Sequence, residues 1–311
     1  MKNNKISAYA PASIGNVSVG FDCLGLALTQ PGDTVSIENG TRPGIHLVRI
    51  EGDLGRLPKK TEENVVGVVI RSMLERLGRY DAMAVTLTKG LPLKSGLGSS
   101  AASSVAAAVA ANAFLGEPFT KEELLPFAME GERLACGAAH ADNVAPALLG
   151  GITLIRPMSD PPDIIRIPFP KDLWCAVVHP DAAVATRDAR AVLPELVPRD
   201  TAIRQSAYLA AFVTGLQQHD TDLISRSMVD LIAEPARKHL IPHFDEVREA
   251  ALRAGALGCG ISGSGPTLFA LCKGKRSANR TAKAMGKVYN VHQLACETYI
   301  SGINAEGAVL L

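Results

Sequence analysis

The feature that most constrains the fold is a run of small residues from Gly96 to Gly116, GLGSSAASSVAAAVAANAFLG. Its second part favours a helix that is apolar on nearly every side, and such a helix has to be buried. The run is too poor in leucine, isoleucine and phenylalanine for a membrane span. We therefore predict a buried helix of a soluble protein over residues 101–115, closed by Gly116.

Composition narrows the classes of function. The chain has 311 residues and is 47% apolar, which is enough for a large core and for two domains. Its 32 basic and 31 acidic residues leave a net charge of +1, so no global field favours nucleic acid. The six cysteines form no CxxC pair, and the first residues contain no long apolar segment. We expect reduced thiols in a cytoplasmic protein, with no nucleic-acid or membrane partner.

Strands and helices mix along the chain without a regular βαβ repeat, which favours an α+β fold. We expect a helix from Asn64 to Gly78. The segments GDTVSIENG (32–40) and IHLVRIEG (45–52) alternate in the manner of antiparallel strands. A short strand near the start should end at a Pro-Ala-Ser turn over residues 11–13.

The next helix has its own start signal. Thr120 and Glu123 have the spacing of a helix capping box, and Pro126 should bend or restart the helix that follows.

A change of composition in the middle of the chain suggests a domain boundary. The stretch PMSDPPD (157–163) is rich in proline and acidic residues. We therefore expect one domain over residues 1–156 and a second over residues 157–311.

The glycine-serine turn before the alanine-rich helix favours a phosphate site. The first N–H groups of a helix lack partners within the helix and carry partial positive charge. Gly96 and Gly98 let a phosphate approach the backbone, and Ser99 and Ser100 offer hydroxyl groups. The alternative is a glycine turn before a helix that only packs closely, and this stretch alone leaves it open.

Two standard phosphate motifs are excluded. The chain has no GxxxxGK followed by serine or threonine, so it carries no P-loop. GLGSSA (96–101) and GCGISG (258–263) resemble a dinucleotide fingerprint in their letters. Neither meets the required context, in which the motif follows a strand, opens a helix and precedes an acidic residue at a strand end.

Three segments together resemble the signatures of the GHMP kinases, a family of small-molecule kinases. They are APASIGNVSVGFDCLGLAL (10–28), PLKSGLGSSAA (92–102) and GCGISGSGPTLFAL (258–271), which stand in the family's order and span nearly the whole chain. Four further segments are similar to sequences of the homoserine-phosphorylating branch of the family: NVSVGFD, HADNVAPALLGG, ATRDARAVLP and IAEPARKHLIP.

The resemblance implies a fold and a reaction. The two-domain α+β fold would have an N-terminal, ATP-binding domain like domain 2 of ribosomal protein S5. The C-terminal GHMP kinase domain would be ferredoxin-like, with the active site in the cleft between the two. The implied reaction is transfer of the γ-phosphoryl group of MgATP to the hydroxyl group of L-homoserine. Its product, O-phospho-L-homoserine, serves threonine biosynthesis, and the resemblance also implies a homodimer.

The resemblance also implies the residues that bind ATP and Mg²⁺. Asn64 is expected near the adenine, although it fits a helix N-cap equally well. Ser100 and Glu132 are expected to hold Mg²⁺, with Ser99 as the alternative serine; without the resemblance, Glu132 would be a surface acid paired with Arg133 or Lys121. The phosphate loop comprises Pro92, Leu93, Lys94, Ser95, Gly96, Leu97, Gly98, Ser99, Ser100, Ala101 and Ala102.

The acceptor is expected to be a small zwitterion that carries a hydroxyl group. Its carboxylate favours arginine as a planar, bidentate donor, which the resemblance assigns to Arg190 and Arg237, and its amino group is assigned to Asp22. Without the resemblance these residues would be ordinary ion-pair or turn residues. The full acceptor set is Asn16, Asp22, His140, Asn143, Thr186, Arg190, Arg237 and Gly263.

The catalytic set implied by the resemblance is Ser100, Glu132 and Asn143. An amide cannot accept the proton of a hydroxyl group, so we expect Asn143 to orient the acceptor and no side chain to act as base. The proton would then pass to the γ-phosphate itself. Two other functions stay open: a GHMP kinase for another alcohol, such as a mevalonate-like acid, and a non-catalytic sensor of nucleotide or metabolite on the same scaffold.

Overall fold

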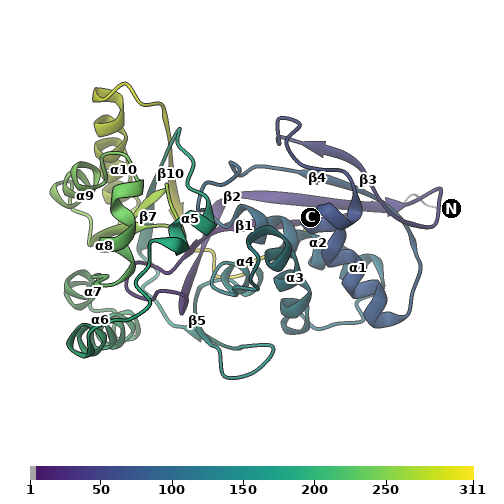
Figure 1. The fold of residues 1–311 in the computed structure, drawn as a ribbon, viewed down its shortest axis with the longest axis horizontal. Helices are drawn as coiled ribbons and strands as arrows, with labels where there is room; N and C mark the ends of the chain where they lie inside the picture. Colours follow the sequence, from purple (N-terminus) through teal and green to yellow (C-terminus); the bar gives the residue numbers. More distant parts are fainter. Residues whose placement is uncertain (1–4) are drawn as a thin grey trace.

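The first of two sheets is seven-stranded and organises the N-terminal half of the chain (Figure 1). The structure is a computed structural model that describes residues 5–311. Five strands lie in the order β11-β1-β2-β4-β3, while β5 pairs with β2 and β6 pairs with β5. The strands are β1 (Ile6–Gly15), β2 (Leu24–Asn39), β3 (Gly44–Glu51), β4 (Ala82–Thr88), β5 (Ile152–Arg156), β6 (Asp163–Ile167) and β11 (Val309–Leu310).

The N-terminal strand corrects one prediction. The turn expected over residues 11–13 is wrong, because β1 continues through it and pairs with β2 on both sides. The register shifts between Pro11 and Ser13. Proline cannot donate a ladder hydrogen bond, but a bulge accommodates it without ending the strand.

The third strand corrects another prediction. β3 does not pair antiparallel with β2; it pairs in parallel with β4. The connection between β3 and β4 contains α1 (Val65–Leu77), and a crossover of this kind is what parallel neighbours require. The limits of α1 are confirmed: the Asn64 side chain accepts from the Val66 N–H, and Gly78 closes the helix at φ 62°.

The alanine-rich helix α2 (Ser99–Phe114) lies at the centre of the N-terminal half. It starts two residues before the predicted range, and its residues 101–108 are all buried. It packs against β1, β2, α1, α3 (Leu125–Cys136) and α4 (Val144–Leu149). The predicted burial is confirmed, because side chains the size of alanine let so many elements approach one backbone.

The segment before α3 behaves as its sequence predicts. Thr120 N–H donates to Glu123 Oε2 at 2.8 Å, and Glu123 N–H donates to Thr120 Oγ1 at 3.3 Å, so the capping box is formed. A short 3₁₀ turn, η2 (Glu122–Leu124), follows, and α3 restarts with Pro126 in its first turn. Proline is tolerated there because the first N–H groups of a helix have no partner within it.

The second sheet is antiparallel, and helices cover both of its faces. Its order is β10-β7-β9-β8. Side chains alternate along β7, so that Val177 belongs to the same buried cluster as Phe212 of α6, while Val178 belongs to a second cluster with Val247 of α9. Figure 1 shows α9 and α10 on one side of β7, and α6 and α7 on the other. The elements are β7 (Leu173–Pro180), β8 (Gly258–Ile261), β9 (Leu268–Lys273), β10 (Cys296–Gly302), α6 (Arg199–Gln218), α7 (Thr221–Ser227), α9 (Phe244–Arg253) and α10 (Gly274–Val291).

Four short helical elements complete the fold. They are α5 (Thr186–Ala191), α8 (Ala233–Arg237), and the 3₁₀ turns η1 (Thr61–Glu63) and η3 (Lys238–Leu240). We keep the domain division at residues 156 and 157 as a proposal. It falls in the connection between β5 and β6, and β6 still belongs to the first sheet. Among residues 5–311, no helix combines the length and the apolar character needed to cross a bilayer.

Candidate active site

A cleft of about 780 Å³ lies where the three sequence motifs meet. The motifs touch through backbone hydrogen bonds: Ser13 N–H donates to the Leu97 carbonyl at 3.1 Å, and Gly263 N–H donates to the Gly15 carbonyl at 3.2 Å. Ser262 Oγ also donates to the Gly96 carbonyl at 2.7 Å. The glycine-serine loop is therefore held between the end of β1 and the turn that joins β8 to β9.

Two glycines make this close packing possible. Gly96 and Gly98 have φ values of 82° and 63°, a region that side chains other than glycine rarely adopt. A Cβ at Gly98 would lie 2.1 Å from Ser13 Oγ, and one at Gly96 would lie 2.6 Å from the Ser262 carbonyl oxygen. The loop needs glycine both for its conformation and for the space it occupies.

Replacing Gly98 with alanine should lower stability and weaken nucleotide binding. Gly78→Ala is a matched control, because Gly78 has φ 62° and ψ 33° against 63° and 35° at Gly98, and nothing lies within 4 Å of its added Cβ. We expect the control to lose about 1 kcal/mol, and Gly98→Ala to lose more and to raise the KM for ATP. Equal urea midpoints for the two variants would contradict the argument from close contact.

A buried ion pair supports the first turn of α2, and our reading of the sequence missed it. Lys89 Nζ contacts Asp33 Oδ2, Ser99 Oγ at 2.8 Å and Ser103 Oγ at 2.9 Å. Burial lowers the pKa of Lys89, and the Asp33 carboxylate opposes that effect. Lys89 lines the cleft, so its charge lies where the loop would meet a phosphate.

Asp33 is the partner that fixes this lysine. Asp33 lies on β2, opposite Ala10 of β1, and its side chain is fully buried. Its Oδ1 accepts from the N–H groups of Gly90 and Leu91, at 3.0 and 3.2 Å. The sequence could have predicted this pair only in part. An acidic residue inside an alternating strand indicates that it has a buried cationic partner, but it does not identify that partner.

Glu132 has the surroundings of a metal ligand. It lies on α3, is buried and lines the cleft, so the alternative of a surface acid paired with Arg133 or Lys121 is wrong. Arg133 pairs with Glu130 instead. Burial raises the pKa of Glu132, and the Ser100 hydroxyl partly opposes this. Within residues 5–311 its Oε1 has no hydrogen-bond partner. A buried carboxylate oxygen without a partner, beside a serine hydroxyl, fits a hard divalent cation such as Mg²⁺.

Asn143 is held in place by its neighbours. It precedes α4, where its Oδ1 accepts from Ser13 Oγ at 3.0 Å and its Nδ2 donates to Asp142 Oδ2 at 3.3 Å. Gly15 permits this arrangement, because a Cβ there would lie 2.4 Å from Asp142 Oδ2. The amide of Asn143 thus faces the cleft in a fixed orientation.

Asp142 was not among the residues selected from the sequence, although it stands inside the quoted word HADN. It lines the cleft and is buried. Burial, with the nearby Asp22 and Glu132 carboxylates, raises the pKa of Asp142 to about 7. A carboxyl group that titrates near neutral pH in a cleft is a candidate for a functional residue.

The acidic and basic residues expected at the acceptor face each other. Arg190 Nη2 donates to both oxygens of Asp22, at 2.8 and 3.1 Å, and lies 3.4 Å from His140 Nδ1. Burial and the Arg190 charge lower the pKa of His140, so the ring is neutral at physiological pH. Asp22 itself has φ 55° and is held by a hydrogen bond from its N–H to Asn16 Oδ1.

A second arginine enters from α8. Arg237 Nε donates to the Ala189 carbonyl at 2.8 Å, and its Nη1 donates to the Gly263 carbonyl at 3.1 Å. The ring of Phe21 lies under both guanidinium groups, 4.9 Å from that of Arg237 and 5.7 Å from that of Arg190. Both cations therefore contact the same aromatic ring, whose electron-rich faces attract positive charge.

The cleft gathers nearly all the residues selected from the sequence. All eight expected acceptor residues line it, as do Asn64, Glu132 and the loop residues Leu93, Lys94, Ser95, Gly96, Gly98, Ser99 and Ser100. Leu97, Ala101 and Ala102 are fully buried in the core, and Pro92 also lies outside the lining. Asn64 caps α1 while it faces the cleft, beside Pro58 and Glu62, which the sequence did not single out.

Comparison with known proteins decides the family. The model of the GHMP kinases N terminal domain matches residues 64–151, and the model of the GHMP kinases C terminal domain matches residues 212–291. The chain belongs to the GHMP kinase family. Residues of both matched segments line the cleft, and the two matches confirm the family that the motifs implied.

Curated relatives that match this GHMP kinase over nearly their full length include homoserine kinases. Those of Chlorobium phaeobacteroides (strain BS1) and Chloroherpeton thalassium are 44% and 43% identical to it, over 98% and 99% of this chain and 99% of each relative. The crystal structure of homoserine kinase from Cytophaga hutchinsonii has a TM-score of 0.96 at 46% identity, covering 100% of this chain and 98% of that one. The mevalonate kinase of L. major has the same fold at 16% identity, with a TM-score of 0.72 over 95% of both chains.

Proposed function

We propose that this GHMP kinase transfers the γ-phosphoryl group of ATP to the hydroxyl group of L-homoserine, giving O-phospho-L-homoserine and ADP. The observation that carries the proposal is the set of paired charges at the acceptor end of the cleft. Arg190 and Arg237 converge on the same aromatic ring, and Asp22 lies beside them. A small molecule with both a carboxylate and an ammonium group complements this arrangement.

ATP binding is expected along the glycine-serine loop. The N–H groups at the start of α2 and the ammonium group of Lys89 supply positive charge for the triphosphate. Asn64, at the start of α1, is the proposed contact near the adenine. Ser100 and Glu132 are the proposed ligands of Mg²⁺, which would neutralise part of the negative charge that the phosphates carry.

Catalysis in this site rests on positioning. Asn143 is fixed by Ser13 and Asp142, and we propose that its amide orients the acceptor hydroxyl toward the γ-phosphate. An amide cannot take the proton, so the phosphate itself accepts it. The neutral ring of His140 and the hydroxyl of Thr186 complete the acceptor site.

Comparing acceptors directly tests this proposal. ADP release should be measured with L-homoserine, mevalonate and shikimate side by side, and the product checked by mass spectrometry. We expect turnover with L-homoserine alone. Arg190→Met should raise the KM for homoserine and leave that for ATP unchanged, while the exposed neighbour variant Arg187→Met should change neither. Turnover with mevalonate would favour the other kinase, and none with any acceptor would favour a sensor.

Homoserine binding should depend on pH through Asp142. Its pKa of about 7 means that the carboxylate is charged above that pH and neutral below it. If it attracts the ammonium group of homoserine, the KM should rise about tenfold between about pH 8 and pH 6, at constant kcat. Asp142→Asn should have a high KM that no longer depends on pH. A collapse of kcat in this variant would instead identify Asp142 as the base and contradict the role given to the phosphate.

The proposed assembly and location rest on the family resemblance alone. We propose a homodimer in the cytoplasm. Sedimentation equilibrium of the full chain checks the first part, and a mass of one chain at micromolar concentration would contradict it.

A further inference from the structure

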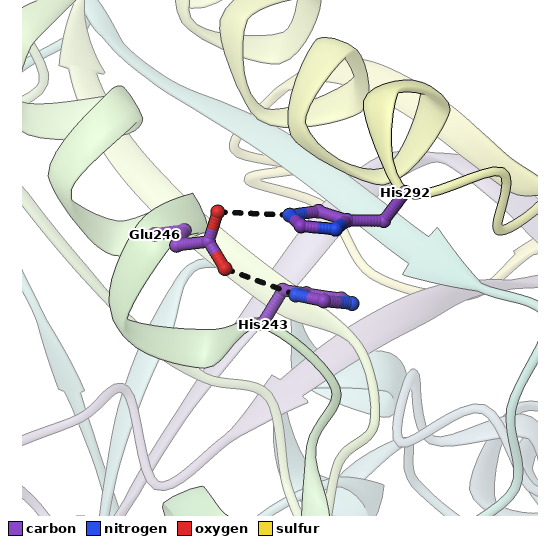
Figure 2. Close-up of side chains that lie close together, drawn as sticks. All are labelled: His243, Glu246 and His292. Atoms are coloured by element: carbon purple, nitrogen blue, oxygen red, sulfur yellow. Dashed lines mark hydrogen bonds and ion pairs between the residues drawn. The ribbon is translucent and has the colours of Figure 1, made fainter.

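Two histidines and a glutamate form a cluster at the start of α9 and the end of α10 (Figure 2). His243 Nδ1 lies 3.0 Å from Glu246 Oε1, and His292 Nε2 lies 2.9 Å from Glu246 Oε2. The two imidazole rings are stacked, with centroids 3.6 Å apart and planes inclined by 13°. None of these residues lines the catalytic cleft.

We propose that His243, Glu246 and His292 form a binding site for a borderline transition-metal ion, with Zn²⁺ as the reference ion. Across residues 5–311, this is the only group of three such side chains whose ligand atoms all lie within 4.8 Å of one another. Two imidazole nitrogens and one carboxylate oxygen are ligands that Zn²⁺ prefers. The proposal does not depend on the kinase reaction or on its Mg²⁺.

The two helices hold the ligands in a stable frame. His243 precedes α9 and His292 follows α10, so residues far apart in the sequence meet where these helices pack together. Val247 and Tyr289, which are fully buried, anchor the adjoining turns in the core. Bridging these helix ends would fasten α9 to α10.

No lysine or arginine among the described residues pairs with the carboxylate of the cluster. In the described chain, the only ion-pair partners of Glu246 are the two histidines. The basic residues nearby on α9 and before it are engaged elsewhere: Lys238 pairs with Asp245, and Arg248 pairs with Glu234. A divalent ion would therefore meet a carboxylate that no lysine or arginine neutralises.

Coordination requires a small change of the side chains. Tetrahedral Zn²⁺ with bonds of about 2.0–2.2 Å separates its ligand atoms by about 3.3 Å, slightly more than the present N···O distances. The stacked rings must also turn apart so that their nitrogen lone pairs converge. The histidine side chains are 31% and 34% exposed, which leaves them free to turn and leaves a fourth position open to water.

Titration calorimetry of the full chain with ZnCl₂ tests the site. We expect one ion per chain, with excess Mg²⁺ unable to compete. Glu246→Gln and His292→Asn should each weaken Zn²⁺ binding at least about tenfold. Glu249→Gln on the same helix and His46→Asn on β3 are matched controls that should bind as the unaltered protein does. Zn²⁺ should raise the melting temperature of the unaltered protein and of both controls, but not of the cluster variants.

Co²⁺ absorption separates this site from the cysteines. Binding at the cluster gives ligand-field bands without a thiolate charge-transfer band, because none of its ligands is sulfur. A thiolate band, unaltered affinity in Glu246→Gln, or no Zn²⁺ binding at all would overturn the proposal. MgATP-dependent turnover should be the same in Glu246→Gln as in the unaltered chain, so that the result is independent of the kinase assignment.

Discussion

Replacing Glu132 with glutamine should lower kcat about a thousandfold while the protein keeps its fold. The Glu132 carboxylate is buried, and its Oε1 has no protein partner among residues 5–311. Such a charge is costly to the folded state and is retained where it binds a cation. Glu132 would hold the Mg²⁺ that stabilises negative charge on the transferring phosphate, and losing one such electrostatic contribution typically costs about 10²–10³ in rate, or about 3–4 kcal/mol. Steady-state kinetics at several Mg²⁺ concentrations should show a matching rise in the Mg²⁺ requirement.

Glu130→Gln is the matched control for this prediction. It makes the same chemical change two residues earlier on α3, at a side chain that is 41% exposed and paired with Arg133. We expect its kcat to be unchanged. Burial raises the pKa of Glu132, so its charged form is disfavoured by folding, and Glu132→Gln should melt no lower than the unaltered protein at neutral pH. If both variants retained full activity, the proposed metal site would be wrong.

Replacing Lys89 with methionine should destabilise the protein by about 3–5 kcal/mol. The substitution leaves the buried carboxylate of Asp33 without its cation, and an uncompensated charge in a core is strongly unfavourable. Ser99 and Ser103 also lose a hydrogen-bond donor at the start of α2. Urea unfolding followed by circular dichroism measures the change in the free energy of unfolding.

A double variant separates the lost charge from the lost packing. Asp33→Asn combined with Lys89→Met removes both charges, while the amide oxygen still accepts from the Gly90 and Leu91 N–H groups. We expect it to recover most of the stability but not the affinity for ATP, because the positive charge at the phosphate loop stays absent. Lys60→Met, which breaks the exposed pair with Glu63, should have little effect. A double variant no more stable than Lys89→Met would contradict this account.

The elements most accurately predicted from sequence are those with local causes. The limits of α1 follow from its N-cap Asn64 and its closing Gly78, and the Thr120–Glu123 capping box formed as expected. These features depend on backbone groups a few residues away, so the sequence contains all that decides them. The burial of α2 followed in the same way from the small size of its side chains.

The errors concern pairings between distant segments. The alternation of IHLVRIEG predicted a strand, but its parallel partner β4 was decided by the crossover through α1. Pro11 suggested a turn, but β1 continues through it, because its pairing with the long strand β2 resumes after a register shift between Pro11 and Ser13. A period of two residues shows that one face is buried and says nothing about which neighbour buries it.

The same distinction between local and long-range causes applies to the residues of the candidate site. Local requirements of backbone shape and phosphate charge pointed to the glycine-serine loop, whereas the resemblance carried by the sequence motifs supplied the family and most of the other selected residues that line the cleft. Only the tertiary structure decided that Lys89 is paired with Asp33, that Asp142 lies buried beside Asn143, and that His243 and His292 meet across Glu246. The physical reason is that charge, pKa and metal binding depend on burial and on neighbours brought together by packing, and no short stretch of chain contains those neighbours.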